Sequence, residues 1–237
     1  MLQSLKQAYS IRLGATDGSL GHVKDFYFDD HTWTVRYVVI DTGTWLSRRK
    51  VLITPHSLGR LELNKGVLNV NLTRKQLEDS PTIDLHKPVS RQFEEDYVKY
   101  FGIPSYWLGD SATGMTEANV EASAQGLLTA ANIPSGTPAP ARNEPLLRST
   151  LAVQGYHLNT TEGIVGHICD FMFDPDEWII RQLVIKTGLR LSGPEVLVSA
   201  TTIFQISYSE SSAFTNLSES EVLKSPVHAL APAHIAS

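Results

Sequence analysis

The chain has 237 residues, of which 42% are hydrophobic and 19% charged, with a formal net charge of −5 at pH 7. This composition indicates a folded protein of one or two domains, and the negative charge argues against non-specific binding to nucleic acid. A single cysteine, Cys169, excludes an intrachain disulfide and a zinc site built from several cysteines. No apolar run approaches the roughly 18 residues of a membrane helix, and the N-terminus lacks the apolar core of a signal peptide, so we expect a cytoplasmic protein.

An internal repeat organises the sequence. The segment that begins at Leu13 aligns without a gap with the segment that begins at Leu158, at a constant offset of 145 residues. Identical pairs along this alignment include Gly21/Gly166, His22/His167, Asp25/Asp170, Phe26/Phe171, Phe28/Phe173, Asp29/Asp174, Trp33/Trp178 and Arg36/Arg181. Each copy is roughly 80 residues long and can form a small core of its own, so the pattern predicts a duplication and not a solenoid.

Each copy is predicted to begin with a β-hairpin. Residues 20–28 and 33–42 are rich in Val, Ile, Tyr and Phe, and the polar residues 29–32 between them predict the turn. In copy two the turn falls at residues 174–177. Further elements are expected as strands at 51–53, 61–63, 67–72 and 196–198, and as one helical turn at 73–79 and 218–224.

The alternation of the first strand is irregular. Val23, Phe26 and Phe28 cannot all lie on one face of a regular strand, so we expect a bulge near Lys24-Asp25 and at the matching place in copy two, near Cys169-Asp170. A sheet that is buried on both faces is the alternative. The expected core includes Phe26, Phe28, Val39, Ile40, Phe171, Phe173, Val184 and Ile185.

Residues 90–107 follow copy one and have no counterpart after copy two. Ser90 as an N-cap and Gly102 as a stop predict a helix with an aromatic stripe on one face. The candidate interaction surface consists of the aromatic residues Phe93, Tyr97, Phe101, Tyr106 and Trp107. The alternative is that this stripe packs inside the protein or between subunits of a homo-oligomer.

The composition shifts between the copies. Residues 109–145 are rich in Ala, Ser, Thr, Gly, Asn and Pro and are expected to form a flexible linker. This shift predicts a first domain at residues 1–108, which includes the aromatic helix, and a second domain at residues 146–237.

Two motifs raise the question of catalysis or metal binding. The Asp-Thr-Gly sequence at 41–43 matches the local signature of aspartic proteases, which need two aspartates that share a proton, but copy two has Lys186 in place of the aspartate. The His22 and Asp25 pair recurs in copy two, yet two ligands are too few for a closed zinc site. We favour a turn for the first motif and a histidine hydrogen-bonded within the hairpin for the second.

The remaining polar residues of the hairpin have structural interpretations. Asp29 and its counterpart in copy two are expected to stabilise the turns through their own backbone. Arg36, just across the turn, is expected to pair with Asp25, and Arg181 to pair with Asp170, as structural ion pairs. Because no nucleophile and base occur at a recognisable spacing, we expect a protein that is not an enzyme and holds no metal or cofactor.

One motif set keeps its order and spacing in both copies. It consists of Gly21–Phe26, Phe28-Asp29, Trp33 and the strand Val38–Gly43 in copy one. This pattern resembles the PRC-barrel family, over residues 8–83 and 153–228. The family is named after the cytoplasmic domain of the photosynthetic reaction-centre H subunit and includes the C-terminal domain of a ribosome-maturation factor. The resemblance implies a small β-barrel that acts as an assembly or adaptor module, without catalytic residues to carry over.

These observations predict a mainly β protein with two tandem small PRC-type β-barrels, and a short helical segment and a flexible linker between them. We expect an interaction or assembly module that binds one or more protein partners, does not bind nucleic acid directly and does not span a membrane. Two alternatives stay open: a cytoplasmic-side regulatory factor of a photosynthetic or electron-transfer complex, and a ribosome- or RNA-processing accessory factor. Because barrels of this size are marginal alone, we also expect the copies to contact each other or to form a homodimer.

Overall fold

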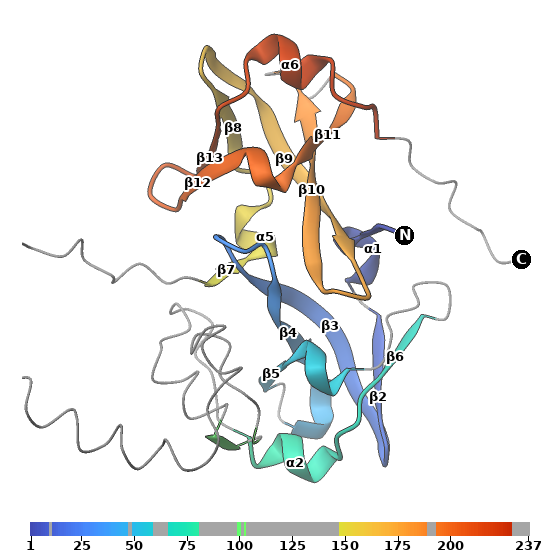
Figure 1. The fold of residues 1–237 in the computed structure, drawn as a ribbon. Helices are drawn as coiled ribbons and strands as arrows, with labels where there is room; N and C mark the ends of the chain where they lie inside the picture. The colour runs from blue at the N-terminus through green and yellow to red at the C-terminus, as the bar shows by residue number, and fades with distance from the viewer. Residues whose placement is uncertain are drawn as a thin grey trace, which may run out of the picture. The chain divides into compact units, whose positions relative to one another are not determined.

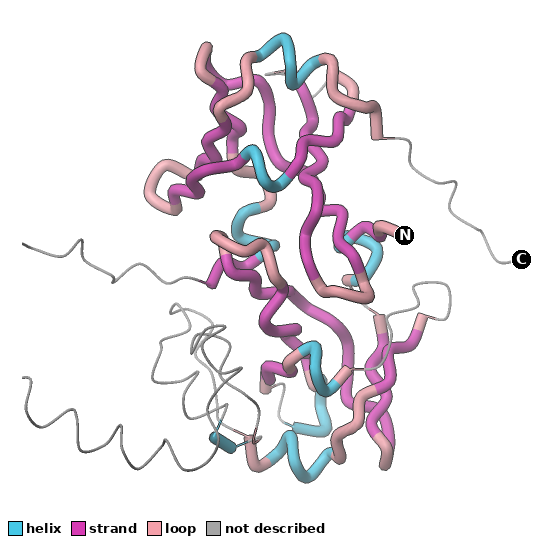
Figure 2. Tube along the Cα trace, in the orientation of Figure 1, coloured by secondary structure: helices cyan, strands magenta, loops and turns pink. Residues whose placement is uncertain are grey.

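A computed structural model describes residues 1–9, 11–46, 49–58, 66–80, 99–100, 102, 147–188 and 193–228. Residues 1–88 and 146–237 form one compact unit and residues 89–145 a second. The described part of the chain is mainly β, in two separate sheets, as predicted (Figures 1 and 2). The predicted domain boundaries at residues 108 and 146 fall outside the described ranges. No helix among the described residues is long and apolar enough to cross a membrane.

Five strands follow the same order in both sheets, and the second sheet has β12 as a sixth strand at its edge. The first has the order β5-β4-β3-β2-β6, made of Lys50–Ile53, Val35–Asp41, Gly18–Asp29, Arg12–Ala15 and Val67–Asn69. The second has the order β11-β10-β9-β8-β13-β12, made of Glu195–Ser199, Ile179–Thr187, Gly163–Asp174, His157–Thr160, Ser212–Thr215 and Ile203–Ser207. Two short strands complete the sheets: β7 (Leu147–Ser149) pairs with β3, and β1 (Gln3–Ser4) pairs with β9. The predicted strand at 61–63 lies outside the described residues.

Short helices accompany the strands. They are α1 (Leu5–Ala8), α2 (Arg74–Glu78), α5 (Thr150–Val153) and α6 (Glu219–Leu223). The helices α2 and α6 confirm the helical turns that were expected at residues 73–79 and 218–224, near the end of each copy. Each starts with a capping box: in α2 the Thr73 side chain accepts a hydrogen bond from Gln76 N, and the Gln76 side chain accepts one from Thr73 N.

The predicted bulges are confirmed in the long strands of both sheets. The pairing of β3 with β4 shifts between Val23 and Asp25, so that Lys24 is the extra residue. The pairing of β9 with β10 shifts in the same way at Cys169. The bulges let apolar residues on both sides of them reach the core. The predicted core residues are all buried: Phe26, Phe28, Val39, Ile40, Phe171, Phe173, Val184 and Ile185.

A glycine lies where β3 passes close to the end of β4. A Cβ atom on Gly21 would lie 2.0 Å from the carbonyl oxygen of Asp41, and one on Gly166 would lie 2.3 Å from that of Lys186. Gly21 also has a φ of 134°, which other residues rarely adopt. The repeated glycine is therefore required for the two strands to pass at this distance.

Candidate interaction site

The segment that precedes each copy crosses to the sheet of the other copy. β1 pairs antiparallel with β9, with Ser4 opposite Met172, and β7 pairs antiparallel with β3, with Ser149 opposite Tyr27. In Figure 1, α1 lies beside β9 and α5 beside β3, as their contacts require. Because Ser4 and Ser149 are related by the repeat offset, the exchange is reciprocal.

A buried aspartate of the first sheet binds the segment that precedes copy two. The Asp25 carboxylate accepts hydrogen bonds from Ser149 Oγ (2.5 Å) and Thr150 Oγ1 (2.9 Å). It also accepts bonds from Leu151 N (3.1 Å) and from Phe26 N (2.8 Å). Asp25 is only 8% exposed, and this burial raises the pKa of its carboxyl although the hydrogen bonds favour the charged form.

The second sheet makes the matching contact. Asp170, also buried, accepts hydrogen bonds from Ser4 Oγ, from Lys6 N (3.0 Å) and from Phe171 N (2.7 Å). Each carboxylate therefore lies at the first turn of a short helix, α1 or α5, where backbone N–H groups have no partner within the helix. The bulge next to each aspartate places it there.

The two hairpins also pair with each other through their backbones. Val35 N donates to Trp178 O (2.7 Å), and Ile180 N donates to Trp33 O (2.8 Å). Each of these bonds maps onto the other by the repeat offset, which is the pattern of a local two-fold axis. Both tryptophans have a positive φ of 58°, so the two turns have the same backbone form.

Aromatic rings fill the space between the two sheets. The ring centroids of Phe28 and Phe171 lie 5.9 Å apart, and those of Phe26 and Phe173 lie 6.4 Å apart. Trp33 stacks on Phe28 at 5.2 Å. These distances are typical of favourable aromatic pairs, and all five side chains are buried. The predicted contact between the copies is confirmed, and the contact surface is part of the core.

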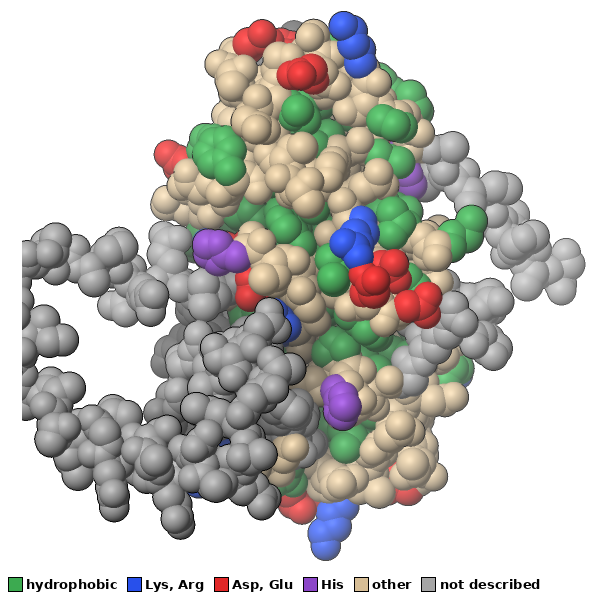
Figure 3. Space-filling view, in the orientation of Figure 1, with side chains coloured by type: hydrophobic (Ala, Val, Ile, Leu, Met, Phe, Trp, Pro, Cys, Tyr) green, Lys and Arg blue, Asp and Glu red, His purple; other side chains and the backbone are tan. Residues whose placement is uncertain are grey.

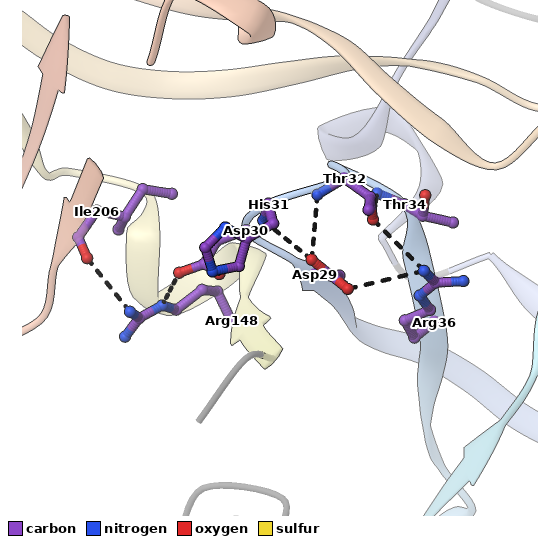
Figure 4. Close-up of polar contacts among 8 residues, drawn as sticks. All are labelled: Asp29, Asp30, His31, Thr32, Thr34, Arg36, Arg148 and Ile206. Atoms are coloured by element: carbon purple, nitrogen blue, oxygen red, sulfur yellow. Dashed lines mark hydrogen bonds and ion pairs between the residues drawn. The ribbon is translucent and has the colours of Figure 1, made fainter. Parts of the chain in front are cut away.

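One polar contact breaks the two-fold pattern (Figure 4). Arg148 of β7 pairs with Asp30 of the first hairpin turn (Nε–Oδ2 2.7 Å) and donates to the carbonyl of Ile206 in β12 (3.3 Å). The two charged side chains are only 11% and 13% exposed. The counterparts at the repeat offset are Gln3 and Pro175, which cannot form an ion pair. This buried pair is specific to one side of the junction.

A second contact is likewise one-sided. The Tyr9 hydroxyl is hydrogen-bonded to Thr150 Oγ1 (2.9 Å), and its ring packs against Phe26 with centroids 5.8 Å apart. Burial raises the pKa of Tyr9, so this hydroxyl keeps its proton. The counterparts of Thr150 and Tyr9 are Leu5 and Gln154, which cannot repeat the bond between hydroxyl groups.

An open groove of about 580 Å³ runs over the junction. Residues 31–33 of the first hairpin turn line one side, and residues 179–182 and 199–201 line the other. Its titratable side chains among the described residues are exposed: His31 is 78% exposed, and Arg181 is 46% exposed and pairs with Glu177. Neither of these side chains is a buried charge of the kind that would select a small ligand.

Two exposed aromatic residues lie at the outer strand β12, Phe204 within the strand and Tyr208 in the turn directly after it. Phe204 is 68% exposed and Tyr208 is 73% exposed. The pairing of β12 with β13 shifts at Phe204, so this residue is a bulge that directs its side chain outward. The centroid of its ring lies 6.3 Å from that of Phe214. On the face drawn in Figure 3, charged side chains are few and scattered, with hydrophobic ones between them.

The role predicted for the hairpin aspartates is confirmed, and that of the arginines is wrong. Asp29 Oδ1 accepts hydrogen bonds from His31 N (2.9 Å) and Thr32 N (3.1 Å), which closes the turn. Arg36 lies 3.7 Å from Asp29 and not against Asp25. In copy two, the partner of Arg181 is Glu177 and not Asp170. The reason is that Asp25 and Asp170 face the crossing segments, whereas both arginines are extra residues of a second bulge.

The Asp-Thr-Gly motif forms the predicted turn, whereas the predicted hydrogen bond of the His22 side chain stays a prediction. Asp41 Oδ1 accepts a hydrogen bond from Gly43 N (2.9 Å), as a turn after a strand requires. His22 is exposed while Asp25 is buried, so the pair does not face one site. Within the described ranges, no group of three or more His, Cys, Asp or Glu side chains is arranged to hold a metal ion.

The interaction surface predicted from the sequence, Phe93, Tyr97, Phe101, Tyr106 and Trp107, lies outside the described residues and stays a prediction. The residues that sequence reasoning missed are those of the crossing segments. One signal was present, because Ser4 and Ser149 keep the same offset as Asp25 and Asp170. That signal points to a shared role but does not say which copy each serine serves.

Comparison with known proteins gives two matches. Residues 13–77 match the model of the PRC-barrel domain. An uncharacterized protein of Deinococcus radiodurans is 33% identical over 66 residues, which is 28% of this chain and 23% of that protein. The chain thus matches less than a quarter of the length of this relative.

Proposed function

Because residues 13–77 belong to the PRC-barrel family, we propose that this protein is a non-enzymatic interaction module that binds a protein partner along β12. A PRC-barrel domain suggests, in general, a role in protein interaction or assembly. Our proposal for this chain has two parts: the two copies act as one body, and the partner binds on the second sheet. The reciprocal exchange of β1 and β7 supports the first part.

The observation that supports the second part is the exposure of Phe204 on the outer strand β12 and of Tyr208 in the turn directly after it. Large aromatic side chains are enriched at the centres of protein interfaces, where they bury much area at a small loss of conformational entropy. A bulge aims Phe204 away from the core, so its exposure is a feature of the strand geometry. Arg148 donates a hydrogen bond to the carbonyl of Ile206, which lies between Phe204 and Tyr208, and this contact holds β12 against the junction.

The opposite edge of the second sheet differs from β12. The outer side of β11 is covered by residues 226–228, where Leu197 N donates to Pro226 O (2.8 Å) and His228 N donates to Glu195 O (2.7 Å). No described strand covers the outer side of β12. An uncovered outer strand with exposed aromatic side chains is a typical place for a protein partner to dock.

The test is recovery of partners from the native host by chemical cross-linking, affinity purification and mass spectrometry. The double variant Phe204→Ser/Tyr208→Ser is compared with the wild type and with the control Ile164→Ser/Leu223→Ser, whose residues are 45% and 49% exposed elsewhere on this unit. The proposal predicts partners that the wild type and the control share and that the β12 variant loses. Equal recovery by all three proteins would contradict it, provided that their melting temperatures agree.

A further inference from the structure

We propose that the two copies recognise each other between chains as well as within one, and that they pair only copy one with copy two. The partner is therefore a second copy of this chain. The inference rests on the junction between the copies and is independent of what β12 binds.

None of the contacts described at the junction requires the two copies to belong to the same chain. Each copy receives a crossing segment on a buried aspartate and provides one in return. Thr34 and Ile179 face each other on the local two-fold axis as a bridge between the hairpins. Two chains that exchanged copies would form this junction twice and close as a symmetric dimer, with every described contact of the junction retained.

The buried ion pair makes the junction selective. Arg148 comes from the segment before copy two and Asp30 from the turn of copy one. If copy one paired with itself, Gln3 would face Asp30, and if copy two paired with itself, Arg148 would face Pro175. Neither self-pair would form this ion pair, which disfavours both self-pairs relative to the mixed pair. Only the mixed pair brings Arg148 against Asp30.

The hydrogen bond between the Tyr9 and Thr150 hydroxyls also favours pairing of copy one with copy two. Thr150 bonds to both Asp25 and Tyr9, which belong to copy one and its preceding segment. In a self-pair of copy one, Leu5 would take the place of Thr150 and would leave the Tyr9 hydroxyl and one acceptor site of Asp25 without this donor. The ion pair and the hydroxyl contact, whose residues differ between the copies, can thus form only in a mixed pair.

Pairing of the two copies within one chain competes with their pairing between two chains. Residues 81–146 connect the copies, and a tether raises the effective concentration of each copy for the other to about the millimolar range. The closed chain is therefore favoured in dilute solution, and exchange is favoured when unfolded chains refold together at high concentration. A disulfide that forms irreversibly between two chains captures exchanged pairs even when they are the minor form.

The experiment traps the bridge between residues 34 and 179 with a disulfide in full-length chains that carry Cys169→Ser. One variant has Thr34→Cys and the other, with a tag of different size, has Ile179→Cys. Facing residues of an antiparallel bridge have Cα atoms about 4.5–5.5 Å apart, within the range of a disulfide. A single chain with both cysteines is the control for the geometry and must form an intrachain disulfide.

The proposal predicts that the two variants, unfolded and refolded together and then oxidised, give a mixed disulfide dimer. This dimer should exceed either like-with-like dimer by about tenfold or more, which corresponds to about 1.4 kcal/mol. Arg148→Gln on the Ile179→Cys chain should lower the ratio of this mixed dimer to the Ile179→Cys like dimer about tenfold, because the mixed junction loses its ion pair and the self-pair of copy two no longer encloses an arginine. Arg181→Gln, at an exposed arginine, should leave this ratio unchanged. Equal amounts of mixed and like dimers, no mixed dimer, equal effects of the two arginine changes, or no disulfide in the control would each overturn the proposal.

Discussion

At Asp25, the unfavourable burial of a carboxylate is offset by four hydrogen bonds, three of them from the segment before copy two. Ser149, Thr150 and Leu151 are distant from Asp25 in the sequence, so the carboxylate ties the end of the linker region to the first sheet. These bonds fix the position of the segment against Asp25, because each lost bond would leave a donor unsatisfied.

The first prediction is that Asp25→Ala destabilises the protein by about 3 kcal/mol, since it leaves the hydroxyls of Ser149 and Thr150 and the N–H of Leu151 without their acceptor. Urea unfolding measures the loss. The control is Glu210→Ala, at an exposed position where about 0.5 kcal/mol or less is expected. A loss at Asp25 as small as the loss at Glu210 would mean that the crossing segment is not held there.

The raised pKa of Asp25 gives a pH dependence of defined sign. The folded state binds the proton more tightly than the unfolded state, so this group favours folding fully below the ordinary aspartate pKa of about 4, and the contribution is lost as the pH rises through the raised pKa. Asp25→Asn lacks this titration. The stability of the wild type relative to Asp25→Asn should therefore fall as the pH rises from about 4 towards neutrality. A relative stability that rises over the same range would contradict the direction.

At the scale of elements, the sequence predicts what is local and misses what is long-range. The hairpin formed by β3 and β4, the bulge at Lys24 and the capped helix α2 follow from alternation, turn residues and capping residues within a few positions. The crossing strands β1 and β7 span only two and three residues, too few for any periodicity. Their pairing depends on which distant sheet offers a free edge, and no local pattern encodes that choice.

The same limit explains the misassigned arginines. Opposite charges a short distance apart in sequence predict an ion pair between Arg36 and Asp25. The structure instead turns Asp25 towards the crossing segment, because the bulge at Lys24 changes the direction of the side chains that follow it. The site could be predicted only as far as the recurrence of Asp25, and the donors that surround it come from the other end of the chain.

The close approach of β3 to β4 gives a prediction for the glycines. Gly21→Ala should destabilise the protein by about 3 kcal/mol or more, because its Cβ would lie 2.0 Å from a backbone oxygen, which cannot yield as a side chain can. The matched control is Gly43→Ala, which also has a positive φ but has no atom within 4 Å of the added Cβ, and should cost about 1 kcal/mol. Equal losses in urea unfolding would show that backbone conformation alone, and not the contact, sets the requirement at Gly21.

At the scale of the molecule, the exchange of β1 and β7 means that neither copy completes its own sheet. Residues 1–88 and 146–237 form one compact unit, and the aromatic rings between the sheets are buried as in the interior of a single domain. A copy of roughly 80 residues would be marginal by itself. The two copies therefore share one compact unit, in which their hairpins pair about a local two-fold axis.

The most direct test of this account is to cut the chain between the copies. A protease site placed within residues 109–145 allows the folded protein to be cleaved, and native mass spectrometry then measures what stays together. The account predicts that the two fragments remain one particle with the mass of the intact chain, and that Asp25→Ala combined with Arg148→Gln makes them separate more readily. Fragments of the wild type that separate and stay folded, each at its own mass, would contradict it.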